Sequence, residues 1–146
     1  MFMTTIITIC IGILGGIAVG IQSPIAGAMS QRVGGTASSF VVHSGGAILS
    51  GILLLFRGGE QIRSWRSLPW YMLTSGVFGL ILYLTLSQTL PRLGATTAIA
   101  LIIIGQLVVG LLIDQFGLLG IEQRPIDVQK IAAALCLVTG GYLMTK

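Results

Sequence analysis

The sequence predicts an all-α integral membrane protein, built as one bundle of five transmembrane helices. Hydrophobic residues make up 54% of the 146 residues and charged residues only 8%, a composition typical of membrane proteins. Uncharged apolar stretches of about 20 residues recur, which is the length that a helix needs to cross about 30 Å of hydrocarbon. The longest polar stretch covers only residues 57–68, too short for a soluble domain. We therefore expect a single membrane domain over residues 1–146.

The five helices are expected near residues 4–28, 36–56, 69–90, 94–116 and 128–145. The connections between them are short, and each contains the glycine, proline or charge that marks helix ends at a water interface. Five crossings place the two termini on opposite faces of the membrane. The first apolar run is too long, and too poor in basic residues, for a secretory signal peptide.

The first helix carries a stripe of glycines at four-residue spacing, formed by Gly12, Gly16 and Gly20. Small residues at this spacing let a neighbouring helix approach closely. Two interpretations stay open: the stripe provides tight packing only, or it forms a surface along which helices slide during function.

Pro24 follows the stripe and predicts a helix break, because proline cannot donate a hydrogen bond to the carbonyl of Gly20. A carbonyl freed at that depth needs a partner from the protein or from a water-lined cavity. Gln22 and Ser23 lie beside the break, where they can satisfy the backbone or present polar groups to a ligand. The alternative is a kink at the membrane interface, capped by local side chains.

His43, the only histidine, lies about 5 Å from the centre of the second predicted helix. Imidazole titrates near neutral pH, and ionisable groups inside membranes often mark paths for ions or substrates. Either His43 is such a pathway residue, or it is a packing group bonded to a serine or glutamine.

Gln106 falls at the middle of the fourth predicted helix, and Asp114 lies about 12 Å nearer to the following loop. Asp114 is expected in the headgroup region, paired with Arg124 or capping the next connection, and is also a candidate pathway residue. The amide of Gln106 needs partners inside the bundle. It either fixes a neighbouring helix or lines a cavity.

Positive charge is distributed unevenly between the two faces, which indicates orientation. The face with the N-terminus holds five basic residues and the opposite face three: Arg57, Arg63, Arg66, Arg124 and Lys130 against Arg32, Arg92 and Lys146. This bias favours a cytoplasmic N-terminus in the bacterial inner membrane, but it is weak enough to permit insertion in both directions. The formal net charge of +4 is expected to anchor the chain to anionic headgroups, not to nucleic acid.

Enzymatic and metal chemistry have no support in the sequence. Cys10 and Cys136 lie inside predicted helices, without the spacing of a metal site, and are expected to be small core residues. Motifs for hydrolytic, phosphate-binding or redox chemistry do not occur. We therefore expect neither a catalytic site nor a cofactor nor a metal.

The chain resembles the five-helix YdcZ-type branch of the drug/metabolite transporter superfamily. The resemblance is carried by IQSPIAGAMS, by a histidine and glycines in the second helix, and most specifically by PRLGATTAIALIIIGQLVVGLLIDQFGLLG. It implies a half-size transporter unit that assembles in pairs of opposite orientation, either as a homodimer or with an oppositely oriented paralogue. The related four-helix multidrug exporters use a glutamate in their first helix, whereas this chain has no carboxylate before Glu60. A titrating role would therefore fall to Asp114 or His43.

The sequence thus favours a transporter or exporter of an unknown small molecule, working by alternating access between two inverted copies. Two other functions stay open. The chain can be an accessory or assembly subunit whose polar groups only hold helices together, or a small channel, which its glycine-rich helices permit.

Overall fold

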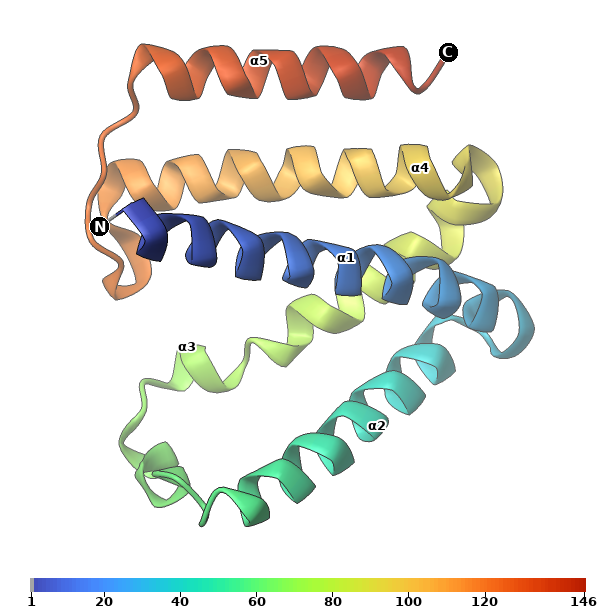
Figure 1. Cartoon of the computed structure of the whole chain (residues 1–146). Coiled ribbons are helices and arrows are strands. Elements are labelled where there is room, and N and C mark those ends of the chain that lie inside the picture. Colours follow the sequence, from blue (N-terminus) through green and yellow to red (C-terminus); the bar gives the residue numbers. More distant parts are fainter. Residues whose placement is uncertain (1) are drawn as a thin grey trace. The chain divides into compact units, whose positions relative to one another are not determined.

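The computed structural model describes residues 2–146, and every regular element in that part of the chain is a helix, which confirms the all-α membrane fold (Figure 1). The α-helices are α1 (Phe2–Val33), α2 (Gly35–Phe56), α3 (Trp70–Leu73), α4 (Gly76–Phe116) and α5 (Val128–Leu143). Two short 3₁₀ helices, η1 (Ile62–Ser67) and η2 (Leu118–Gly120), lie in the longer connections.

Contacts divide the chain into two compact units, and each is described by itself. The first unit comprises Met1–Pro91 and the second Arg92–Lys146. The first therefore contains α1, α2, α3 and the beginning of α4, while the second contains the remainder of α4 and α5. The assignment of residues 1–146 to a single domain stays a prediction.

Single glycines end two of the helices. Gly34 separates α1 from α2 with φ 88° and ψ 153°, and Gly94 interrupts α4 with φ 77° and ψ 167°. A positive φ is open to glycine at little cost, because glycine has no Cβ. Each of these glycines follows an arginine and a branched apolar residue, in the order Arg-Val-Gly and Arg-Leu-Gly. The short connections expected between the first and second predicted helices, and between the third and fourth, are thus reduced to one non-helical residue each.

The break at Gly94 divides a helical region that is too long for one crossing. Trp70–Phe116 comprises 47 apolar-rich residues, which would extend about 70 Å as one straight helix, against about 30 Å of hydrocarbon. The parts before and after Gly94 correspond to the third and fourth predicted spans. By length and composition, Met3–Val33 and Gly35–Phe56 can also cross a membrane, whereas α5, with 16 residues, is shorter.

The third predicted helix, residues 69–90, is not continuous. It begins with the four residues of α3, turns at Thr74 and Ser75, and resumes as α4 at Gly76. The hydroxyl of Thr74 donates to the carbonyl of Tyr71 at 2.9 Å. Such local bonding by threonine and serine, next to a glycine, competes with regular helix.

Pro24, in contrast, lies inside an uninterrupted α1, although the sequence predicts a break there. Proline removes one backbone hydrogen bond but has a φ compatible with helix. The flanking turns of α1 remain helical on both sides of Pro24.

Small residues bring α1, α2 and α4 together in the first unit. The hydroxyl of Ser38 on α2 donates to the carbonyl of Ala26 on α1 at 3.0 Å, and both residues are almost completely buried. A Cβ on Gly27 would meet the side chain of Leu90, and one on Gly35 would meet Ser87. Close backbone approach at such positions is the usual basis of helix packing in membranes.

Gly27→Ala is therefore expected to destabilise the protein by about 1–3 kcal/mol, because the added methyl group overlaps Leu90. Thermal unfolding in detergent measures the effect. Gly15→Ala, on the same helix with no atom within 4 Å of a Cβ, is the control and should leave stability equal or slightly higher. Adding Leu90→Ala to Gly27→Ala should produce less destabilisation than the sum of the single changes; full additivity would show that the overlap is not the cause.

Unlike Gly27, the glycines of the α1 stripe do not pack against a neighbouring helix of the first unit. Within its own unit, no heavy atom lies within 4 Å of a Cβ placed on Gly12, Gly16 or Gly20. Tight packing within the first unit therefore does not account for the stripe.

In the second unit, α5 lies antiparallel beside the part of α4 that follows Gly94, as the orange and red ribbons show (Figure 1). Contacts mark both ends of α5. Lys130 approaches Asp114 at one end, Gly141 packs against Ile104, and the hydroxyl of Thr97 donates to the carbonyl of Met144 at 2.9 Å at the other end. The pair is thus joined near both ends of α5.

Candidate functional site

A polar cluster joins three helices of the first unit. The amide of Gln22 on α1 donates to the hydroxyl of Tyr83 on α4 at 2.9 Å. The ring of Tyr83 makes an edge contact with the imidazole of His43 on α2, with centroids 5.4 Å apart and planes at 61°. We call Gln22, His43 and Tyr83, with the Ser39 and Gly79 that contact His43, the Tyr83 cluster.

His43 is fixed from two sides. Its Nδ1 lies 2.7 Å from the backbone carbonyl oxygen of Ser39, one helical turn earlier, and 3.2 Å from the Ser39 hydroxyl. On the other side, a Cβ built on Gly79 would overlap the imidazole edge at Nε2. The ring therefore occupies the space that the missing side chain of Gly79 leaves.

The Tyr83 cluster lies deep in the apolar segments. His43 is about 4 Å from the centre of α2, measured along the helix axis. Tyr83 is buried near the middle of the segment between Trp70 and Gly94. Polar groups at such depth are costly unless they are bonded to each other, and they commonly mark functional sites. The cluster is thus the strongest candidate site in the first unit.

Ser23 has a local role. Its buried hydroxyl donates to the carbonyl of Val19 at 2.8 Å, one turn earlier on α1. Its proton is therefore used within the helix, next to Pro24. The proposal that Ser23 contributes to a pathway stays a prediction.

The second unit contains a pocket of about 500 Å³ between α4 and α5, and Gln106 and Asp114 both line it. The other lining residues are Lys130 and an apolar set: Ile103, Leu107, Gly110, Leu111 and Ala133. The pocket thus combines an apolar wall with one amide and one pair of opposite charges. It extends over the two helical turns that separate Gln106 from Asp114, about 12 Å.

Of the two roles expected for Asp114, an ion pair with Arg124 is wrong. Its carboxylate lies 3.7 Å from Nζ of Lys130, and both side chains are about one-third exposed, whereas Arg124 pairs with Glu122 at 3.4 Å. The ammonium of Lys130 also donates to the carbonyls of Arg124 and Pro125. This arrangement follows from the antiparallel pair, because the first turn of α5 lies beside the last turn of α4. The backbone of Arg124 still bonds to the carbonyl of Asp114 at 2.8 Å.

Gln106→Leu is expected to weaken ligand binding by about tenfold or more while leaving stability nearly unchanged. Among the described residues, the Gln106 side chain makes no hydrogen bond, so replacing it by an apolar group of similar size removes no internal partner. Binding and thermal stability are measured on one sample, with a solute found by ligand-stabilisation screening. Gln129→Leu, outside the pocket, is the matched control. A loss of stability with unchanged affinity would mean that Gln106 holds helices together.

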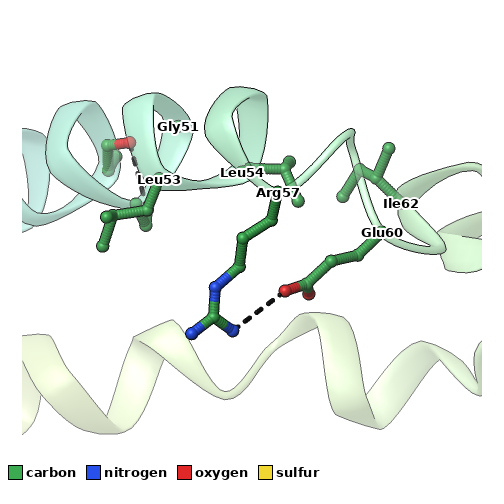
Figure 2. Close-up of a pocket in the computed structure, with 8 residues that line it drawn as sticks. Gly51, Leu53, Leu54, Arg57, Glu60 and Ile62 are labelled. Carbon is green, nitrogen blue, oxygen red and sulfur yellow. Dashed lines mark hydrogen bonds and ion pairs between the residues drawn. The ribbon is translucent and has the colours of Figure 1, made fainter.

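A larger pocket, of about 550 Å³, lies at the end of α2 (Figure 2). Figure 2 shows Arg57 and Glu60, which both line it, pointing toward each other; Nη1 and Oε1 are 3.2 Å apart. Both side chains are mostly exposed, so this ion pair contributes at most about 1 kcal/mol. Because its charges neutralise each other at the helix end, this pocket is a weaker candidate than the Tyr83 cluster.

The structure thus brings Gln22 and His43 together through Tyr83, and it places Gln106 and Asp114 in one pocket of the second unit. Tyr83, Gly79 and Lys130 were not recognised from the sequence. One signal was available: Gly79 and Tyr83 are four residues apart and so share a face of α4.

Metal binding has no site in the described residues, where no group of three or more histidine, cysteine, aspartate or glutamate residues could hold an ion. A family model described as "Putative inner membrane exporter, YdcZ" matches residues 7–143. The searches of curated proteins and of solved structures each find no match.

Proposed function

Because the chain belongs to the YdcZ family, a family of the drug/metabolite transporter type described as inner membrane exporters, we propose that it exports a small molecule by alternating access. Export proceeds in an antiparallel dimer, in which two copies are related by a two-fold axis in the membrane plane. Alternating access then exchanges two equivalent states, since each copy takes the other's role.

The observation that carries this proposal is the Tyr83 cluster. Three helices contribute to it, so a relative movement of α1, α2 or α4 changes the cluster directly. The bond between Gln22 and Tyr83 joins residues 61 positions apart in the chain. A polar group that depends on three apolar helices is suited to bind a solute in one arrangement and release it in another.

Two features support the inverted dimer. The glycine stripe of α1 has no neighbour in its own unit, which leaves it free to contact a second copy. The basic residues differ by only two between the faces, five against three, so both orientations are accessible to the chain. The two-residue excess favours a cytoplasmic N-terminus, which makes an oppositely oriented paralogue the alternative partner.

Transport by purified protein in liposomes tests the function. Slow, saturable export of at least one solute from a broad panel is the expected result. Electrogenic flux at very high turnover would instead indicate a channel, and no flux with any solute would indicate an accessory subunit.

A further inference from the structure

The imidazole of His43 is held in one tautomer. A backbone carbonyl can only accept a hydrogen bond, so the 2.7 Å contact between Nδ1 and the carbonyl of Ser39 requires the proton to reside on Nδ1. In the neutral ring, Nε2 then carries a lone pair and no proton. In water the opposite tautomer predominates, so the fold selects the less common form.

Nε2 points at Gly79. A Cβ at this position would overlap Nε2 first and the neighbouring Cε1 next. Glycine at this position therefore lets the edge of the imidazole lie against the backbone of α4, where any side chain would displace the ring. The ring of Tyr83 covers the imidazole from α4, and Ser39 covers it from α2.

We propose that Nε2 of His43 is a proton-binding site of the first unit, and that Gly79 is the positioning residue that lets the ring keep its place beside Ser39. This inference rests on the proposed function, because it assigns the coupling ion of the same cluster. The proton comes from water, binds the Nε2 lone pair, and converts the imidazole into an imidazolium. No bond within the protein breaks, since Nδ1 keeps its proton and its bond to Ser39.

Protonation of Nε2 changes which solutes the Tyr83 cluster can bind. The neutral ring offers an acceptor at Nε2, whereas the charged ring offers a donor and one positive charge. Among the described residues, Tyr83 is the titratable side chain that contacts His43 from α4; α1 contributes the neutral Gln22 through its bond to Tyr83. The added charge therefore has no carboxylate partner in the cluster, and it alters the affinity of the cluster for any charged solute.

The test uses the fact that the chain has one histidine. Protein labelled with histidine that carries ¹⁵N only in the ring, purified with a tag that contains no histidine and placed in lipid nanodiscs, gives signals from two ring nitrogens only. At high pH we expect a protonated Nδ1 and a bare Nε2. On acidification Nε2 should gain a proton while Nδ1 stays protonated. A high-pH ring protonated on Nε2, or a ring that does not titrate while the protein is folded, would overturn the proposal.

Variants separate the positioning role from simple packing. Gly79→Ala is expected to lose the single-tautomer signal, because the methyl group displaces the ring from Ser39. Gly76→Ala on the same helix has no atom within 4 Å of the new Cβ and should leave both signals unchanged. Ser39→Ala keeps the backbone carbonyl and should keep the tautomer. If Gly79→Ala does not fold, the titration of the wild-type ring and of Tyr83→Phe still decides the question.

Export measurements distinguish the two proposals. We expect wild-type export to change by about tenfold across the pH range in which the NMR signals show Nε2 gaining its proton, and His43→Gln to remove that dependence. If the ring takes up a proton as described but the protein transports no solute, the proposed function is ruled out and the proton site stands. If export by His43→Gln is saturable and depends on pH as strongly as export by the wild type, the proton site is ruled out and the proposed export function stands.

Discussion

Adding three lysines after Lys146 is expected to reduce export by at least about tenfold when that variant is expressed alone. The extra charge holds the C-terminus in the cytoplasm, so all copies insert in one orientation and no inverted pair can form. Reconstituted transport of the solute found by screening measures the loss. Three glutamines at the same place, which add length without charge, should leave export unchanged.

Restoring export by co-expression is the second part of this test. Co-expression with a variant fixed in the opposite orientation, by lysines added to the connection that follows Arg57, should restore export. Undiminished activity from the singly trapped form would rule out the inverted assembly. Recovery only in the presence of an oppositely oriented paralogue would identify a heterodimer instead.

Tyr83→Phe is expected to lower export by about tenfold or more with a loss of stability of only about 0.5–1.5 kcal/mol. The change removes the hydroxyl that accepts from Gln22 at 2.9 Å but keeps the ring that contacts His43. Initial export rates and thermal unfolding are measured on the same preparation. Tyr71→Phe, an exposed tyrosine outside the cluster, is the matched control.

The double variant Gln22→Leu with Tyr83→Phe distinguishes a functional bond from a structural one. Removing both partners of a hydrogen bond leaves neither unsatisfied, so stability should be close to that of the wild type. Export should remain low if the pair binds or releases solute. Export restored together with stability would show that the pair only holds α1 against α4.

The helical segments could be predicted from the sequence because the bilayer fixes their length and excludes unpaired backbone groups. The expected span 36–56 begins within a residue of α2, and α5 begins at the expected residue. The turn at Thr74 and Ser75 was not predicted, because its apolar flanks satisfy the same hydropathy pattern as a continuous helix. The extension of α1 to Val33 was missed for a different reason: polar residues near an interface are compatible with either helix or loop.

The site was less accessible to sequence reasoning. Gln22 and His43 stand out as polar residues in apolar helices, but the tyrosine that connects them does not, because aromatic rings are common in membrane segments. The partner of Asp114 depends on the antiparallel contact of α4 with α5, and hydropathy contains no information about which basic residue lies at that end. Lys130 was expected near the interface, and the structure assigns it to the pocket.

The shortness of α5 has a consequence for biosynthesis. Its 16 residues extend about 24 Å, against about 30 Å of hydrocarbon. Alone, it would leave polar backbone ends within the lipid when it leaves the translocon. Its contacts with Asp114, Ile104 and Thr97 join it to a longer helix synthesised just before it. We therefore expect the last crossing to be inserted as a hairpin with its predecessor.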